Sequence, residues 1–85
     1  MQIDAALVKE QGVTFAVVTV KQGAIGGPDR DALVQQFSAM FEGVPVVLLA
    51  QDSRGGGQFY GRPDLVRFLR NVPISALPWE RWSVH

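Results

Sequence analysis

Two apolar stretches limit what this 85-residue chain can fold into more than any other feature. VTFAVVTVK at residues 13–21 carries apolar side chains at positions of both parities, and VPVVLLA at residues 44–50 is an unbroken apolar run. Strand side chains alternate between the two faces of a sheet, so apolar residues of both parities indicate a strand covered on both sides. We therefore expect two buried central strands.

The segment between these strands has the pattern of an amphipathic helix, expected over residues 28–42. Pro28 suits the first helical position, and Asp29 and Asp31 fall where the helix dipole favours acidic side chains. Gly43 is expected to end the helix. The apolar stripe consists of Leu33, Val34, Phe37, Met40 and Phe41. A strand, a helix and a second strand in this order predict a right-handed unit with parallel strands.

The flanking segments complete a single domain over residues 1–85. We expect a β-hairpin over 3–21 that turns at Gly12, a glycine-rich hairpin over 51–61, a second helix over 63–71 and an irregular tail over 72–85. The predicted order is β-β-α-β-β-α plus the tail. This is an α/β fold, at the border of α+β, with a small mixed sheet of three or four strands and two helices.

Residues 43–69, GVPVVLLAQDSRGGGQFYGRPDLVRFL, resemble the second half of the thioredoxin fold. That half has a proline at the head of a strand, then a hairpin, a glycine and a closing helix. Pro45, Gly61 and the helix around Leu65, Phe68 and Leu69 occupy the matching places. The likeness implies a truncated architecture without redox cysteines and allows a cis Val44–Pro45 peptide bond. It implies no activity.

The apolar content of 47% is generous for so short a chain. If both helices cover one face of the sheet, the face with Ala16 and Val18 stays open. We therefore expect that face to meet a second copy of the chain or a protein partner. Further candidates for an interface are Phe59, Trp79 and Trp82, because aromatic residues are enriched at binding hot spots. The alternative is that the tail packs on its own domain.

The glycine-rich segment raises a second hypothesis. Arg54, Tyr60 and Arg62 surround it, and arginine with an exposed aromatic ring and glycine is typical of surfaces that bind single-stranded RNA or a nucleotide. The formal net charge is zero, however, and RNA-binding surfaces normally carry net positive charge. The simpler interpretation is a hairpin tip whose glycines serve only the turn.

Catalytic chemistry has little support. The chain has no cysteine, which excludes disulfides, thiol redox chemistry and cysteine-bound metals. The only histidine is His85, the last residue, and nothing in the sequence places a base beside Asp52–Ser53. Glycine patterns for phosphate or dinucleotide binding are absent. We expect no cofactor, no metal and no enzyme activity, with a small-ligand-binding protein or enzyme subunit as the third alternative.

Location and origin follow from weaker signals. The first residues, MQID, lack the basic and apolar regions of a signal peptide, and the run at 44–50 is too short to cross a bilayer. We therefore expect a cytoplasmic protein that does not bind membranes. Six arginines against two lysines fit a GC-rich bacterial genome. The leading expectation is a non-catalytic interaction or assembly module that self-associates.

Overall fold

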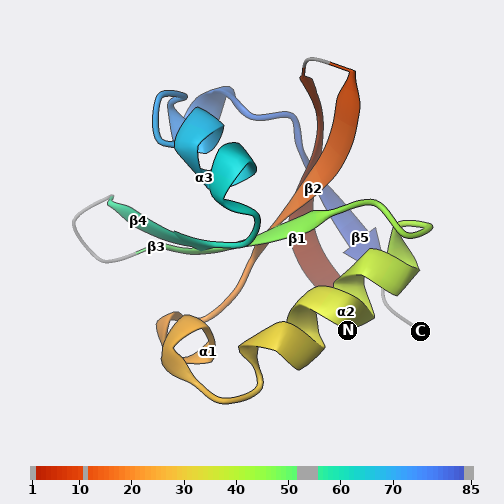
Figure 1. The fold of residues 1–85 in the computed structure, drawn as a ribbon, viewed down its shortest axis with the longest axis vertical. Coiled ribbons are helices and arrows are strands. Elements are labelled where there is room, and N and C mark those ends of the chain that lie inside the picture. The colour runs from red at the N-terminus through yellow and green to blue at the C-terminus, as the bar shows by residue number, and fades with distance from the viewer. Residues whose placement is uncertain (1, 11, 52–55, 84–85) are drawn as a thin grey trace.

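A computed structural model describes residues 2–10, 12–51 and 56–83. These residues form one five-stranded mixed sheet in the order β4-β3-β2-β1-β5, with helices on both of its faces (Figure 1). In chain order the elements are β1 (Gln2–Glu10), β2 (Val13–Thr19), α1 (Gln22–Gly26), α2 (Arg30–Met40), β3 (Val46–Gln51), β4 (Gly57–Tyr60), α3 (Pro63–Leu69), the 3-10 helix η1 (Ile74–Ala76) and β5 (Trp79–Ser83). The α/β class is as expected.

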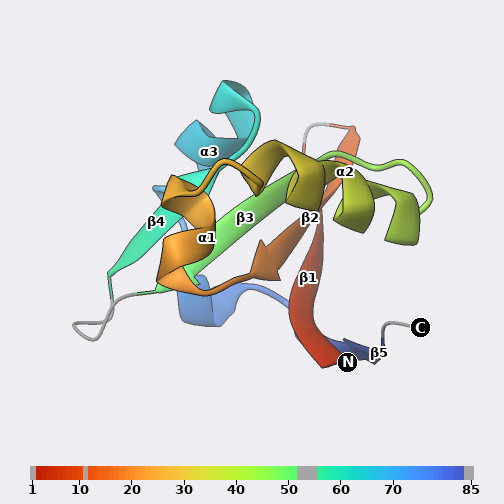
Figure 2. The same ribbon diagram turned by 90° about the horizontal axis from the view of Figure 1, so that it is seen from below.

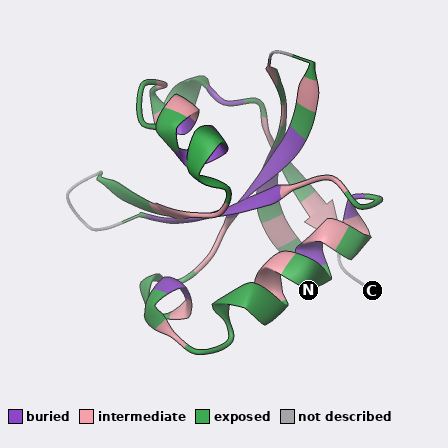
Figure 3. Ribbon diagram, viewed as in Figure 1, coloured by how far each residue is buried: buried purple, intermediate pink, exposed green. Residues whose placement is uncertain are grey.

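Strands β2 and β3 are the buried centre that the two apolar stretches predict. They run parallel, with Ala16 opposite Val46 and Val18 opposite Leu48. The amide of Ala16 also donates a hydrogen bond to the Pro45 carbonyl at 2.9 Å. Figure 3 shows the buried residues concentrated where these strands cross the middle of the molecule. The predicted β-α-β unit is therefore confirmed.

Helices cover both faces of the sheet, and this corrects the prediction of an open face. Helices α1 and α2 lie on one face and α3 on the other, as the two views in Figures 1 and 2 show. Ala16 and Val18 have 0% exposure, because they pack beneath α1 and α2. The residues of β2 and β3 that point to the other face are equally apolar. They are buried because α3 packs on that face.

Two hydrophobic layers result, one on each side of the sheet. The α2-side core contains Ala5, Ala16, Val18, Ile25, Phe37, Phe41, Val46, Leu48 and Ala50. The α3-side core contains Ala6, Phe15, Val17, Val47, Leu49, Leu65, Val66, Leu69 and Leu77. The apolar stripes expected on both main helices face these layers, which confirms those two helical patterns.

The tail is not irregular throughout, and the sheet has five strands rather than three or four. Trp79–Ser83 forms β5, which pairs antiparallel with β1 and sets Trp82 opposite Ile3 and Trp79 opposite Ala6. The tail therefore packs on its own domain. A third α-helix, α1, also lies between the strand expected over 13–21 and the helix expected over 28–42, where no helix was predicted; Ile25 buries its side chain against the sheet.

Smaller corrections concern boundaries. Helix α2 begins at Arg30, two residues after Pro28, and β3 begins directly after Pro45. Gly43 has φ of +86° and its amide donates to the Ser38 carbonyl at 2.7 Å, as expected for a residue that ends a helix. The described residues contain no cis peptide bond, so Val44–Pro45 is trans. In the described part of the chain, none of the helices has the length and apolar character that a membrane crossing requires.

Candidate functional site

The three aromatic candidates for an interface do not form one surface. Trp79 and Trp82 are three residues apart on β5, so their side chains lie on opposite faces of the sheet. Trp79 and Phe59 pack against the α3-side core, and Trp82 packs against the α2-side core. The sequence identified both tryptophans as candidates. It did not show that they face opposite sides of a sheet, because the tail was not recognised as a strand.

Trp79 has a structural position. Its indole Nε1 donates a hydrogen bond to the carbonyl of Ile74 at 2.8 Å, which holds β5 against η1. Its side chain is half-buried, and its polar atom is satisfied within the chain. Trp79 is therefore explained as a packing residue of the domain.

Trp82 lies beside an apolar depression that we call the Leu7 corner. The depression has a volume of about 370 Å³ and is lined by Leu7, Thr14, Met40, Phe41, Glu42, Val44 and Trp82. The rings of Phe41 and Trp82 meet edge to face, with centroids 5.0 Å apart and planes at 82°. The Trp82 Nε1 is buried and has no hydrogen-bond acceptor among the described residues.

Leu7 itself is the feature that sequence reasoning missed. It is the one large hydrophobic side chain that the described residues leave exposed, at 40%. The register explains why: β5 covers β1 only from Gln2 to Ala6, so Leu7 lies just past the end of that pairing. The sequence shows which face of β1 carries Leu7, but it does not show where the pairing of β5 with β1 ends.

Tyr60 belongs to a polar cluster that joins α2 to β4. Its hydroxyl donates a hydrogen bond to Oδ1 of Asp31, and the guanidinium carbon of Arg30 lies 4.4 Å from the centroid of its ring. The hydrogen bond to Asp31, followed by desolvation, raises the pKa of the Tyr60 hydroxyl above its ordinary value. Asp31 was interpreted from the sequence only as a helix-start residue and Arg30 was given no role, so this cluster was missed.

Arg62 is engaged by a neighbour. Its Nε and Nη2 donate to the two carboxylate oxygens of Asp64 at 3.1 and 2.8 Å, and this pairing holds the pKa of Asp64 below its ordinary value. The third residue of the predicted RNA surface, Arg54, lies outside the described residues. The structure thus brings Tyr60 and Arg62 near one another but gives each of them a partner within the chain.

Two arginines, Arg67 on α3 and Arg70 directly after its last residue, have no part in the surfaces predicted from the sequence. They line a depression of about 280 Å³ with Phe59, Tyr60, Gly61, Pro63 and Val66. Both are exposed, and they lie over the end of β4, which is an edge strand. Two arginine side chains therefore lie beside the sheet edge, and their spacing in the sequence did not predict this position.

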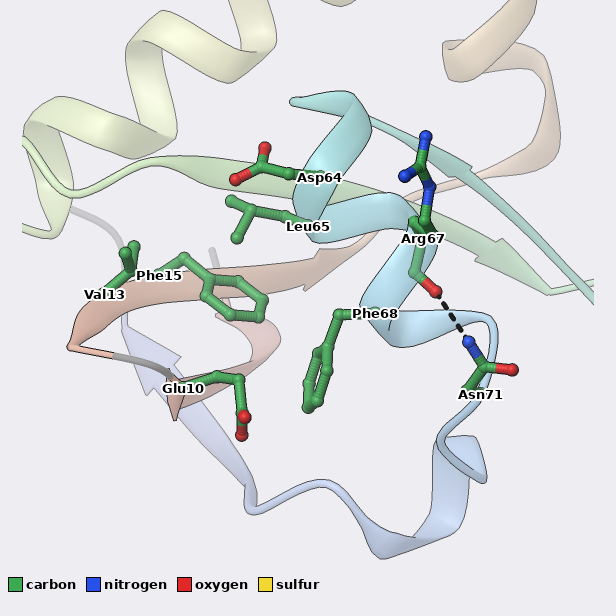
Figure 4. A pocket seen from close by; sticks show the side chains of 8 residues that line it. All are labelled: Glu10, Val13, Phe15, Asp64, Leu65, Arg67, Phe68 and Asn71. Carbon is green, nitrogen blue, oxygen red and sulfur yellow. Dashed lines mark hydrogen bonds between the residues drawn. The ribbon is translucent and has the colours of Figure 1, made fainter.

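A further cleft, of about 300 Å³, separates the β1–β2 hairpin from α3 (Figure 4). Its floor is the edge-to-face pair of Phe15 and Phe68, with centroids 6.4 Å apart. Glu10 stands at its rim on the hairpin side, and the side-chain nitrogen of Asn71 is bound to the Arg67 carbonyl at 3.1 Å. Glu10, Asp64 and Arg67 all line the cleft, so its apolar floor is bordered by charges of both signs. A hollow with an apolar floor and a few polar groups is typical of small-ligand sites, and a small-ligand-binding protein was the third alternative.

No grouping of three or more metal-binding side chains occurs in residues 2–10, 12–51 and 56–83. His85 and the Asp52–Ser53 pair lie outside these ranges. Comparison of the chain with protein-family models, with curated proteins and with solved structures gives no match. The case for a function therefore depends on the surfaces described above.

Proposed function

We propose that this chain is a non-catalytic protein-interaction module that self-associates through the Leu7 corner. The observation that carries the proposal is the 40% exposure of Leu7 beside an apolar depression of about 370 Å³. Elsewhere on the described surface the large hydrophobic side chains are at least half-buried. An apolar side chain next to an apolar hollow is the simplest self-complementary surface.

A two-fold axis suits this arrangement. In a two-fold dimer the same patch is used twice, so Leu7 of each copy would enter the depression of the other. Met40 and Val44 supply apolar walls, and the ring of Trp82 supplies a rigid aromatic side. The covered faces of the sheet, with Ala16 and Val18 fully buried, play no part in the contact.

The expected affinity is low. Burial of a leucine side chain contributes about 1.5–3 kcal/mol, and two such burials must overcome the loss of translational and rotational freedom on association. Together the two burials give only about 3–6 kcal/mol before that loss is subtracted, so we expect a dissociation constant on the order of 1 mM. The dimer should form and dissociate with concentration rather than persist at high dilution.

Light scattering over a concentration series tests the proposal. The average mass should rise from 9.3 kDa as concentration increases. Leu7→Glu places a charge in the contact, beside Glu42, and should hold the chain at the monomer mass. Ala32→Glu, which adds the same charge at an exposed position of α2, is the matched control and should associate like the parent chain. A parent chain that stays monomeric throughout rejects self-association.

A second candidate function is binding of single-stranded RNA at Tyr60 and Arg62. The observation in its favour is that a second cation, Arg30, lies against the Tyr60 ring. Against it, Arg30 occupies the ring face on which a base would stack, and Asp64 already neutralises Arg62. Anisotropy of a labelled oligouridylate at low and moderate salt tests it, since phosphate contacts make binding salt-dependent.

A further inference from the structure

We propose that the outer edge of β4 binds an extended, acidic segment of another polypeptide as an added strand. Strand β4, Gly57–Tyr60, pairs with β3 and is the last strand of the sheet on its side. An edge strand offers backbone N–H and C=O groups to an incoming chain, and main-chain hydrogen bonds of this kind provide affinity in many peptide-binding domains. This surface is separate from the Leu7 corner, so the two proposals fail independently.

Arginines flank this edge on both faces of the sheet. On the α3 face, Arg67 and Arg70 line the depression next to Phe59. On the α2 face, Arg30 lies against Tyr60. Because Phe59 and Tyr60 are consecutive residues of one strand, they mark its two faces, and the cations above and below them face whatever chain pairs with β4.

The carboxylates nearest to these arginines are already bound. Asp31 accepts the hydrogen bond of Tyr60, and Asp64 is paired with Arg62. Within residues 2–10, 12–51 and 56–83, no carboxylate lies within ion-pair distance of Arg30, Arg67 or Arg70. Tyr60 is a neutral donor and does not cancel the charge of Asp31, which offsets Arg30 on the α2 face. Net positive charge at this edge therefore comes from Arg67 and Arg70 on the α3 face, in a chain whose overall charge is zero.

This charge selects the occupant. A second copy that paired through β4 would bring Arg67 and Arg70 of each copy toward those of the other, which like-charge repulsion disfavours. An RNA strand supplies negative charge but lacks the alternating amide and carbonyl groups that complete a sheet edge. An extended peptide with glutamate or aspartate satisfies both the backbone groups and the arginines.

Strand geometry also sets the pattern of the ligand. Side chains of an added strand alternate between the faces, so a carboxylate beside Phe59 would meet Arg67 and Arg70, and its sequence neighbours would lie toward Tyr60 and Arg30. Bidentate arginine–carboxylate contacts are the strongest charged hydrogen bonds available here. A peptide with an acidic residue at every second position can therefore contact Arg67 and Arg70 on the α3 face of the sheet.

The test uses the full chain and a fluorescent peptide of alternating valine and glutamate that is long enough to span β4. We expect binding by anisotropy, weaker at higher salt, and amide shifts centred on Gln58 and Phe59. Arg67→Gln/Arg70→Gln should weaken binding about tenfold or more, as loss of two charge-assisted contacts predicts. Lys9→Gln/Arg81→Gln removes the same charge from β1 and β5 and should leave binding nearly unchanged.

Three control ligands decide between the occupants. A valine–lysine peptide should not bind, and a valine–glutamate peptide methylated at alternate backbone nitrogens should bind much more weakly, because one edge of its backbone is blocked. An oligouridylate should not produce the β4 amide shifts. The proposal is wrong if the acidic peptide fails to bind, if blocking its backbone makes no difference, or if the oligouridylate shifts the β4 amides instead.

Discussion

The guanidinium of Arg30 lies 4.4 Å from the centroid of the Tyr60 ring, and the next residue, Asp31, accepts the hydrogen bond of the Tyr60 hydroxyl. Two consecutive residues of α2 thus hold one aromatic side chain of β4. The contact joins the start of the helix to the edge of the sheet across 29 positions of sequence. It is exposed to solvent, so its chemistry can be measured directly.

Tyr60 is the only tyrosine in the chain, which makes its titration visible by ultraviolet absorbance. The hydrogen bond to Asp31 raises its pKa, so the tyrosinate should appear above the ordinary tyrosine midpoint of about 10. Asp31→Asn removes the carboxylate and should move the midpoint down. A midpoint at or below the ordinary value in the parent chain contradicts the contact.

The same shift predicts a pH dependence of stability. A raised pKa in the folded state means that the protonated hydroxyl is favoured by folding, so its contribution is fully present below about pH 10 and is lost as pH rises through the folded-state value. Denaturant unfolding at increasing alkaline pH should show that the free energy of unfolding falls in the parent chain and falls less in Tyr60→Phe. Equal losses in both chains would show that Tyr60 is not the group responsible.

The pKa of Asp64 is shifted in the opposite direction, so its effect on stability has the opposite pH dependence. Arg62 holds its pKa below the ordinary value, so the stability it contributes is present above the unfolded-state pKa and is lost as pH falls through the lower folded-state value. Carbon-detected NMR titration of the carboxyl groups should find Asp64 among the low values. Arg62→Gln should bring it back toward the ordinary range, whereas Arg70→Gln, which leaves the pair intact, should not.

Gly61 is required by close packing. A Cβ at this position would lie 3.0 Å from Val47 Cγ2, 3.1 Å from the Val46 carbonyl oxygen and 3.1 Å from the Val47 Cα, and two of these atoms are backbone. Gly61→Ala should lower the free energy of unfolding by about 1–3 kcal/mol, the usual cost of overpacking. Gly23→Ala in α1 is the control, because nothing lies within 4 Å of its Cβ position and alanine favours helix. Equal effects from the two substitutions would contradict this packing.

The two tryptophans form a matched pair for a hydrogen-bond test. Trp79 Nε1 donates to the Ile74 carbonyl at 2.8 Å, whereas Trp82 Nε1 is buried without an acceptor in the described part of the chain. Replacement by phenylalanine removes similar volume at each site. Chemical denaturation should show Trp79→Phe as more destabilising than Trp82→Phe by about 1 kcal/mol, the net contribution of one hydrogen bond. The reverse order would mean that the Trp82 N–H has a partner.

Periodicity predicted the parts of the fold that depend on local pattern. Apolar residues of both parities marked β2 and β3, and the stripe around Phe37 marked α2. Strand β5 was missed because Trp79 and Trp82 face opposite sides, so neither face shows a repeat, and because its partner β1 lies at the other end of the chain. Helix α1 was missed because two of its five residues are glycine, which disfavours helix, and a single buried side chain, Ile25, holds it.

The side of the sheet that α3 covers could not be read from its sequence. The apolar face of α3 around Leu65 and Leu69 fits either layer equally well, and only the path from β4 places it opposite α2. The full set of residues around the candidate surfaces could not be predicted for a similar reason. Tyr60 and Arg62 were identified, but Arg30, Asp31 and Leu7 acquire their roles through contacts between distant segments.

Isotope-filtered NOE spectroscopy on a mixture of labelled and unlabelled chains tests the central claim most directly. At concentrations where the mass exceeds 9.3 kDa, the methyl groups of Leu7 should show intermolecular NOEs to the partner's Met40, the partner's Val44 and the indole of the partner's Trp82. Association that gives intermolecular NOEs elsewhere and none at Leu7 would contradict the account, as would a chain that remains monomeric at the same concentrations.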